Sequence, residues 1–445
     1  MGGTPIRILH TADWHLGHEL AGWTREAEQK QVLDDILELA VQHKVDGLII
    51  AGDVFDHQNP SSAMYKMLFG FFDRLSRRAP DLVSIVIAGN HDSAARLEAP
   101  DSLLRRANVV VVGALHQDSR GIDLAHHLVA LGSKERPIGH VLAIPYLRPA
   151  DLPVPEAGKE EVGPGANHDG LGEGSLVNGV RQLYGRAIGA ARTRIGELPL
   201  VVTGHLHVKG ADLSQSLSER RLIIGGEHAI PANCFATEEG RGADYVALGH
   251  LHRAQSLDVT GQEAGQGQDR RQGRVRYAGS PLPLSAVERG YDHGVSLVEL
   301  DETGRVSVEH VPLPRPAPFL RLPETGRLPL EEVEAALTAL ALDPQLPQEQ
   351  RPFVQIALQI SGPQPGFRTR LDEICMKFPI REVAPDIAWP GQAKADENSD
   401  EAPEKRLSEL SPQELFVRAY EERHGVAPEK RYMEGFLRLM EEVGE

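Results

Sequence analysis

Five short groups of aspartate, histidine and asparagine residues are the part of this sequence that could carry chemistry. Each group follows a run of apolar, largely β-branched residues, a pattern typical of a buried strand that stops at a sheet edge. In chain order the groups are Asp13-Trp14-His15, Gly52-Asp53, Gly89-Asn90-His91-Asp92, Gly204-His205 and Gly249-His250-Leu251-His252. The sequence therefore predicts five strand ends whose polar side chains can face a bound ligand.

The ordered set resembles the calcineurin-like metallophosphoesterases, which hold two metal ions at the carboxyl ends of their strands. An isolated Gly-Asp or Gly-His arises by chance in a chain of 445 residues, whereas all five groups in the family order would not. The resemblance implies that Asp53 bridges the two ions and that His91 is the catalytic histidine, which protonates or stabilises the leaving oxygen. It also implies that Asp13, His15 and His252 complete one metal site, and that Asn90, His205 and His250 complete the other.

Two divalent ions suit the hydrolysis of a phosphodiester, because an oxyanion nucleophile must approach a phosphorus that is already anionic. A pair of ions about 3.5–4 Å apart generates hydroxide at neutral pH and holds both the attacking and the leaving oxygen. Oxygen and imidazole ligands without thiolate favour manganese or iron over magnesium alone. We therefore expect two divalent ions as cofactors, with Mn²⁺ preferred.

Several polar residues beside these groups have more than one interpretation. Asp92 could orient His91 or could be purely structural. His207 makes a second His-x-His pattern with His205, and alternation along a strand would place both on one face. We interpret His207 as a residue that supports the ligands and not as a ligand.

The second and third groups separate this chain from the protein phosphatases of the superfamily. Those enzymes carry Arg after the second motif and end the third in Gly-Asn-His-Glu, whereas this chain has Asp56-His57 and Asp92 there. Together with His10–Gly17 and Ala247–His252, these residues are similar to the SbcD family, the nuclease subunits of bacterial SbcCD complexes.

The SbcD resemblance implies 3′ to 5′ exonuclease action on duplex DNA and endonuclease action on single strands and hairpins. It implies work with an SbcC-type ATPase in DNA repair, recombination and replication, as a homodimer within a heterotetramer. Two alternatives stay open from the residues alone. One is a metallophosphatase or phosphodiesterase on the same scaffold, and the other is a non-catalytic DNA-end scaffold.

The elements that must position these residues form an α/β fold. The chain opens β-α-β, with an amphipathic helix over Thr24–His43 and a second helix that Ser61 can cap. Two alternating runs, Val295–Leu300 and Val306–Val311, predict a hairpin. We expect a metallophosphoesterase two-sheet sandwich flanked by helices over residues 1–315, with surface loops or insertions at 151–174 and 261–273.

A proline-rich stretch over Leu313–Pro318 predicts a domain boundary. Residues 316–388 then read as a small α+β domain with helices over Leu330–Leu342 and Phe367–Phe378 and a strand over Val354–Ile360. The resemblance implies that this domain caps the active site and helps to recognise DNA. Residues 389–404 are polar and low in apolar residues, which predicts a linker.

Residues 405–445 predict a helical tail. Ser411-Pro412-Gln413-Glu414 is a capping box that should start a helix running to about Gly425, and a second helix follows. One alternative is that both helices fold back onto the cap. We expect instead that an apolar stripe is left for a partner, which the resemblance identifies as the coiled-coil base of the ATPase. The predicted partner contacts are Leu415, Phe416, Tyr420, Phe436, Leu437 and Met440.

Composition sets outer limits on function. The chain has 47 Lys and Arg against 64 Asp and Glu, a net charge of −17. That balance argues against a generally basic nucleic-acid surface, but it leaves DNA binding open because metal ions and a few Arg can make a cleft locally positive. The two cysteines, Cys234 and Cys375, imply no disulfide framework. No leader peptide and no run of about 20 apolar residues is apparent, so we expect a cytoplasmic protein without membrane contact.

Overall fold

The computed structural model describes most of the chain, in ranges separated by gaps. These ranges are residues 5–118, 121–133, 135–153, 173–212, 229–235, 242–257, 274–360 and 366–388, with Phe416, Val417, Tyr420, Pro428, Tyr432, Met433 and Phe436 of the tail. The chain forms two compact units, Met1–Pro316 and Ala317–Glu445. The predicted loop at 261–273, most of the one at 151–174 and the predicted linker at 389–404 lie outside the described residues.

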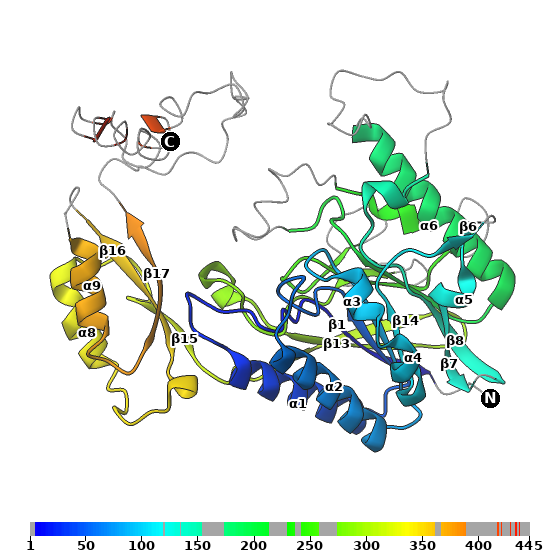
Figure 1. The fold of residues 1–445 in the computed structure, drawn as a ribbon, viewed down its shortest axis with the longest axis horizontal. Helices are drawn as coiled ribbons and strands as arrows, with labels where there is room; N and C mark the ends of the chain where they lie inside the picture. Colours follow the sequence, from blue (N-terminus) through cyan, green and yellow to red (C-terminus); the bar gives the residue numbers. More distant parts are fainter. Residues whose placement is uncertain are drawn as a thin grey trace. The chain divides into compact units, whose positions relative to one another are not determined.

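The first unit contains two six-stranded mixed sheets (Figure 1). The first sheet has the order β14-β13-β1-β2-β3-β4, in which β1 to β4 run parallel and β13 runs antiparallel to both of its neighbours, β1 and β14. Its strands are β1 (Ile6–Thr11), β2 (Gly47–Ala51), β3 (Val83–Ile87), β4 (Val109–Val112), β13 (Gly294–Leu300) and β14 (Val306–Pro312). The predicted β-α-β opening and the predicted hairpin are both confirmed.

The second sheet has the order β11-β12-β10-β9-β8-β7, with β8, β9, β10 and β12 parallel. Its strands are β7 (Leu128–Ser133), β8 (Arg136–Leu142), β9 (Leu200–His205), β10 (Tyr245–Gly249), β11 (Gln255–Leu257) and β12 (Arg274–Tyr277). A two-stranded ribbon, β5 (Gln117–Asp118) with β6 (Gly121–Ile122), is separate from both sheets.

The two sheets pack face to face, and helices cover their outer faces (Figure 1). The helices of this unit are α1 (Glu26–Gln42), α2 (Ser62–Arg78), α3 (Ala94–Glu98), α4 (Asp101–Leu104), α5 (Leu124–His127) and α6 (Glu173–Ile195). Short 3-10 helices are η1 (Arg105–Ala107), η2 (Pro149–Asp151), η3 (Ala232–Phe235) and η4 (Ala286–Gly290). The predicted α/β class, a two-sheet sandwich flanked by helices, is confirmed.

The central strands, such as β2, β3 and β10, are continuous runs of buried, largely apolar residues because they are covered on both faces. In β2, Ile49 and Ala51 face the interior between the sheets, while Leu48 and Ile50 contact the helical layer of α1 and α2. The second sheet packs its outer face against α6 and η3 in the same way. Strand ends, and not strand faces, are therefore where polar side chains can collect.

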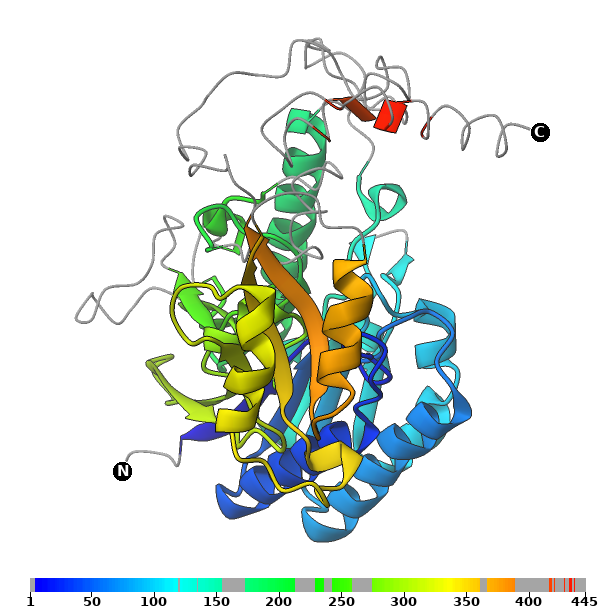
Figure 2. The same cartoon turned by 90° about the vertical axis from the view of Figure 1, so that its left-hand side faces the viewer.

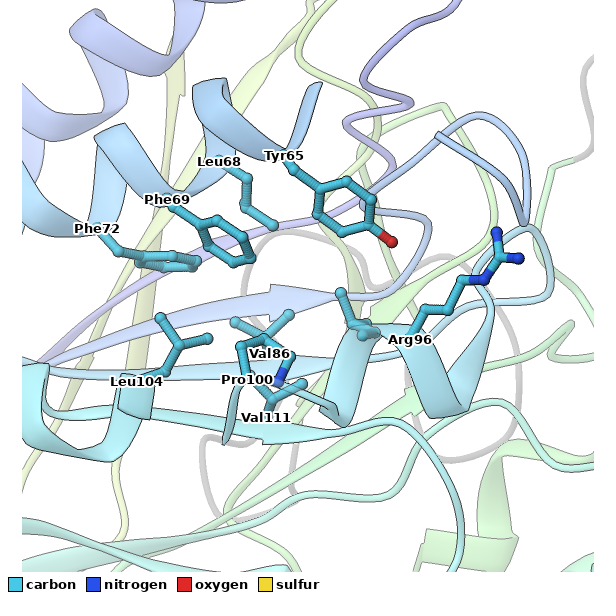
Figure 3. A pocket seen from close by; sticks show the side chains of 10 residues that line it. Tyr65, Leu68, Phe69, Phe72, Val86, Arg96, Pro100, Leu104 and Val111 are labelled. Carbon is cyan, nitrogen blue, oxygen red and sulfur yellow. The ribbon is translucent and has the colours of Figure 1, made fainter. Parts of the chain in front are cut away.

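Helix α2 illustrates how the outer layer is filled. Tyr65, Leu68, Phe69 and Phe72 project from α2 toward Val86 and Val111 of the sheet, and together they line a small apolar pocket that α3 and α4 close (Figure 3). None of the predicted metal ligands lines this pocket. It is a packing feature of the helical layer and lies apart from the polar strand ends.

The second unit has a three-stranded parallel sheet in the order β15-β16-β17. Helices α8 and α9 lie on one face of it (Figures 1 and 2), where their apolar side chains share a core with β16. Its elements are β15 (Phe319–Leu322), η5 (Leu330–Glu332), α8 (Val333–Ala339), η6 (Gln348–Gln350), β16 (Phe353–Gln359), α9 (Phe367–Cys375) and β17 (Arg381–Ala388). The predicted helices and central strand are present, whereas the sequence did not indicate β15 and β17.

The described residues of the tail are helical apart from Pro428, and four of them are aromatic. The ring of Phe416 stacks on that of Phe436, with centroids 4.4 Å apart. Tyr420 and Tyr432 have centroids 5.5 Å apart. The two predicted tail helices therefore contact each other through these rings, which remain half-buried. Leu415, Leu437 and Met440 lie outside the described residues.

Across the described ranges, no helix has the length and apolar character that crossing a membrane requires.

Candidate metal centre

The carboxyl ends of β1, β2 and β3 meet those of β9 and β10, and backbone hydrogen bonds tie the ends together. Asp13 donates its N–H to the Gly52 carbonyl at 3.0 Å, and His15 donates to the Asp53 carbonyl at 3.0 Å. The second sheet joins through His250, whose N–H lies 3.0 Å from Oδ1 of Asp13. The predicted convergence of strand ends is therefore present.

Four of the predicted metal ligands have backbone conformations that residues other than glycine rarely adopt. The φ angles are 55° at Asp13, 44° at His15, 47° at Asp53 and 96° at His250. Each such residue costs about 1–3 kcal/mol of stability, and residues of this kind cluster at functional sites. The strain turns the chain sharply after each strand and brings the side chains inward.

Glycines next to the ligands permit the close approach of the loops. A Cβ atom at Gly89 would overlap the carboxylate of Asp53, and one at Gly249 would overlap the carbonyl oxygen of Ala51. A larger residue at Gly89 would push apart the loops after β2 and β3, and one at Gly249 would push the second sheet away from the first. Gly89 and Gly249 are thus packing requirements of the polar cluster.

One group of possible ligands combines Asp13, His15 and His252. All three are buried, and one ligand atom from each lies within 4.8 Å of the others. Nε2 of His15 is buried and, among the described residues, has no hydrogen-bond partner. A buried imidazole nitrogen in this position is costly unless something binds it, which fits a metal ion.

A second group combines Asp13, Asp53 and His205, again all buried. Asn90 extends it, because Oδ1 of Asn90 lies 3.0 Å from Nε2 of His205 and 3.2 Å from Nδ1 of His250. Asp53 also approaches the first group: its Oδ2 is 3.3 Å from Nε2 of His205 and 3.5 Å from Nε2 of His15. This placement suits a carboxylate that bridges two ions.

Three of the histidines are oriented through their Nδ1 atoms. Nδ1 of His205 donates to the Ala51 carbonyl at 2.8 Å. Nδ1 of His15 lies 3.2 Å from the carboxylate of Asp56, and Nδ1 of His252 lies 3.1 Å from that of Glu288. In each ring the acceptor on Nδ1 leaves Nε2 as the nitrogen that can bind a metal, the usual arrangement of metal-bound imidazoles.

The electrostatics of the cluster favour positive charge. Burial lowers the pKa of His205, but the carboxylate of Asp53 outweighs it and raises that pKa to about 9. Burial raises the pKa of Asp53, yet the neighbouring His205 and His15 hold it well below its usual value. Together with the oxygen and imidazole donors, this field fits divalent cations.

Comparison with known proteins agrees with the geometry. Residues 6–209 match the family described as calcineurin-like phosphoesterase, and residues 315–424 match one described as the type 5 capsule protein repressor C-terminal domain. The SbcD subunit of the SbcCD nuclease of Rhodobacter capsulatus is 41% identical over 416 residues, which covers 93% of this chain and 94% of that protein. The chain belongs to the SbcD family.

Other SbcD relatives extend the likeness. The Escherichia coli K12 protein of that name is 35% identical over 71% of this chain and 70% of its own length. The Bacillus subtilis protein is 27% identical over 99% of both chains. The predicted resemblance is therefore confirmed, and membership of the SbcD family supports a metal-dependent phosphodiester hydrolase.

In this SbcD chain the predicted catalytic histidine stands at the rim of the cluster. Nδ1 of His91 donates to the main-chain carbonyl of Asp56 at 2.8 Å, and the His91 N–H donates to Oδ1 of Asp53 at 2.9 Å. Its ring centroid is 4.9 Å from that of His15. His91 is thus oriented by Asp56 and half-exposed, and its catalytic role stays a prediction.

Asp92 joins the loops that carry the candidate ligands. Its carboxylate accepts the N–H groups of Gly89, Val54 and Phe55 at 2.9, 3.1 and 2.9 Å. Burial, followed by the nearby charge of Asp53, raises the pKa of Asp92 to about 6. These contacts favour a structural role for Asp92. The His91 ring is oriented by the main-chain carbonyl of Asp56 and not by Asp92.

His207 does not lie on the same strand as His205, because β9 ends at His205. It lies beyond the strand in an irregular segment, where its carbonyl accepts the N–H of Ile230 at 2.9 Å. Strand alternation therefore says nothing about the direction of its side chain. A supporting role for His207 stays a prediction.

Glu288 is a functional candidate that the sequence did not indicate. It is fully buried in η4 and contacts His252. Burial raises its pKa, but His252 outweighs this effect and holds the pKa at about 2. The signal available in the sequence was the Ser285-x-x-Glu288 spacing, since the Ser285 hydroxyl donates to Glu288 at 2.9 Å.

Proposed function

We propose that this protein is the nuclease subunit of an SbcCD-type complex that processes DNA ends. In this proposal it hydrolyses DNA phosphodiesters as a 3′ to 5′ exonuclease on duplexes and as an endonuclease on single strands and hairpins. It would serve DNA repair, recombination and the removal of hairpins during replication. The observation that supports this most is the buried Asp13, Asp53, His15 and His205 cluster, in which Asp53 approaches histidines of both ligand groups.

Asp13, His15, His252 and the bridging Asp53 would hold one ion, and Asn90, His205, His250 and Asp53 would hold the other. When bound, such ions supply hydroxide at neutral pH and neutralise charge on the phosphate oxygens. Mn²⁺ is the proposed metal, because the donors are mixed oxygen and imidazole without thiolate.

His91 would act on the leaving oxygen. Because the Asp56 carbonyl can only accept, Nδ1 of His91 must carry a proton, which leaves Nε2 for the substrate. A protonated Nε2 can donate to the leaving oxygen as the phosphorus–oxygen bond breaks. His91 therefore has the orientation that a general acid needs.

The first test compares substrates. With Mn²⁺, the full chain should release nucleotides from linear duplex DNA, and chelation should stop the release by removing the ions that the reaction needs. Turnover of a generic aryl phosphate with DNA left intact would instead support a phosphatase. Absence of turnover on either substrate, with DNA ends still bound, would support the non-catalytic scaffold.

The cap, residues 316–388, is proposed to help select DNA shape. Three of its basic side chains already have acidic neighbours within the cap: Arg321 lies 3.1 Å from Asp386, Arg368 2.9 Å from Glu382, and Lys377 2.8 Å from Glu334. Phosphate groups would have to compete with these ion pairs. The cap would thus contribute shape more than charge to DNA recognition.

The helical tail is proposed to bind the coiled-coil base of an SbcC-type ATPase, within a heterotetramer that contains two copies of each chain. The aromatic rings of Phe416, Tyr420, Tyr432 and Phe436 contact one another and remain half-buried. Such a pair of helices can present its remaining apolar surface to a groove. Leu415, Leu437 and Met440 are the further contacts proposed.

Phe436→Glu should release the ATPase. A charge in this cluster would be desolvated by the partner, so affinity should fall by at least about tenfold, a cost of about 1.4 kcal/mol. ATP-dependent cleavage should be lost while the Mn²⁺-dependent activity of the isolated nuclease is unchanged. Co-purification with the ATPase and cleavage with and without ATP measure both effects.

Phe436→Leu is the matched control, because it keeps an apolar side chain against Phe416 and should retain the ATPase. A chain that ends at Pro403 removes the whole tail. Co-purification of the ATPase with that truncated chain would contradict the proposed role of the tail.

A further inference from the structure

Glu288 is a buried carboxylate that has no place in the proposed two-ion ligand set, yet it contacts a member of that set. Its side chain is fully buried. Oε1 lies 3.1 Å from Nδ1 of His252 and accepts the Ser285 hydroxyl at 2.9 Å. Oε2 accepts the N–H of Leu284 at 2.8 Å. Both carboxylate oxygens are thus engaged, and one of them fixes the ring of a predicted ligand.

The segment that carries Glu288 is itself anchored from three sides. Nε2 of His293 lies 3.0 Å from the Glu288 carbonyl, and Nδ1 of the same ring lies 2.9 Å from the Ser280 carbonyl. Ser280 in turn donates its N–H to the His252 carbonyl at 3.0 Å. Arg25, at the start of α1, donates to the Pro283 carbonyl at 2.6 Å. Glu288 and His252 are therefore held in register by contacts that do not involve a metal.

The two candidate metal sites differ in the groups that accept from Nδ1 of their histidines. His252 and His15 belong to the same ligand group, and each has a carboxylate on Nδ1, from Glu288 and Asp56 respectively. His205, in the other group, has the uncharged Ala51 carbonyl instead. A carboxylate on Nδ1 makes the imidazole a stronger metal ligand than a carbonyl does, and it adds negative charge near the ion.

We infer that Glu288 is a positioning residue that acts through His252 and sets the affinity of one ion of the pair, the ion held with Asp13 and His15. It touches neither substrate nor metal. The ion at His205 and His250 depends on it only indirectly. The inference rests on the proposed function solely in taking His252 as a metal ligand.

Two substitutions separate the charge of Glu288 from its hydrogen bond. Glu288→Gln keeps an oxygen that can accept from Nδ1 of His252 but removes the negative charge. Glu288→Ala removes both. Loss of a residue that orients a metal ligand weakens metal affinity by about 10- to 100-fold, so the alanine variant should lie toward the upper end of that range and the glutamine variant toward the lower end.

The measurement is a Mn²⁺ titration of the full-length, metal-free protein, with bound metal followed calorimetrically and by electron paramagnetic resonance. Wild type should bind two ions and give the signal of a spin-coupled pair. Either Glu288 variant should bind one ion with unchanged affinity and the second more weakly. At two equivalents of Mn²⁺ the variants should therefore show an isolated ion, and excess Mn²⁺ should restore the coupled signal.

Asp244→Asn is the matched control. Asp244 is also a buried carboxylate, and it accepts the Leu200 N–H at 2.8 Å and pairs with Arg192 at 2.8 Å, but it lies at the opposite end of β10 from the site. The Asp244→Asn substitution should lower the melting temperature of the metal-free protein without changing the affinity for either Mn²⁺ ion.

Equal weakening of both ions in the Glu288→Gln protein, or unchanged binding in Glu288→Ala, would overturn the inference. The glutamine variant keeps the question decidable if the alanine variant does not fold. A wild-type protein that binds two ions but leaves DNA intact would contradict the proposed function alone, because the Glu288 effect is measured on metal binding.

Discussion

An Asp53→Asn protein should hydrolyse neither duplex DNA nor hairpins, and it should bind fewer than two Mn²⁺ ions. Asp53 approaches histidines of both ligand groups, with its Oδ2 3.3 Å from Nε2 of His205 and 3.5 Å from Nε2 of His15. An amide has one oxygen and no charge, so it cannot bridge two cations. The loss of turnover should exceed the about 10²- to 10⁴-fold cost of removing a general acid, because nucleophile and charge neutralisation disappear together. Bound manganese per chain and nucleotide release are the two measurements.

Asp46→Asn is the matched control for this variant. Asp46 lies just before β2, whereas Asp53 lies just after it. The carboxylate of Asp46 accepts the Arg7 N–H at 2.8 Å. The same chemical change at the far end of the strand should leave metal content and turnover as in wild type. Full activity of Asp53→Asn with two bound ions would remove Asp53 from the bridging position.

A His91→Ala protein should keep both ions and lose turnover by about two to four orders of magnitude, the usual contribution of a positioned general acid. In the wild-type protein, the ring of His91 contacts the Asp56 carbonyl through Nδ1, and this orientation presents Nε2 to the substrate. The loss should be smaller on substrates whose leaving group needs no proton, such as a nitrophenyl phosphodiester. Single-turnover rates at saturating Mn²⁺ on both substrates measure this difference.

His57→Ala controls for contact with Asp56. The side chain of His57 is 65% exposed and lies 2.8 Å from the Asp56 carboxylate, so it shares this neighbour with His91 but stands outside the ligand groups. Its loss should leave turnover within about twofold, as for an exposed ion pair of little energetic weight. Loss of a metal ion from the His91→Ala protein would make His91 a ligand and not a catalyst.

The strand ends were predictable from the sequence because their signal is local. A β-branched run that stops at glycine, as before Gly52-Asp53 and Gly89-Asn90, marks where a parallel strand delivers its next side chain. Parallel strands of one sheet end at one edge, so Asp13, Asp53 and Asn90 had to be neighbours. The resemblance to metallophosphoesterases then supplied the pairing with the second sheet.

Contacts that exist only in the tertiary structure were not predictable. Glu288 lies 36 residues beyond His252, and no periodicity links the two positions. Asp56 was conspicuous beside Asp53, but its main-chain contact with His91 depends on how the two loops cross. The strand assumed to carry His207 ends at His205, two residues earlier than the alternation required.

The second unit shows a different kind of limit. Strand β17 contains Pro385 and three acidic or basic residues, Arg381, Glu382 and Asp386, which is a poor strand signal. Its pairing with β16 shifts register between Gln355 and Ala357, opposite the proline. An edge strand can accommodate a proline at such an irregularity, but only the partner strand reveals it. The sequence identified β16, which alternates cleanly, and missed its edge neighbours.

The division of the ligand set between two sheets has a consequence for the folding of the first unit. Asp13, Asp53 and Asn90 follow strands of one sheet, and His205, His250 and His252 come from the other. Ions held by both sets would cross-link the halves of the sandwich as a disulfide cross-links two segments, and they would bind only after the halves have packed. Ligation then adds to the cooperativity of unfolding, by about 2.7 kcal/mol for each ion at a free concentration one hundred times its dissociation constant. Metal starvation would therefore lower the stability of the sandwich as well as remove its chemistry.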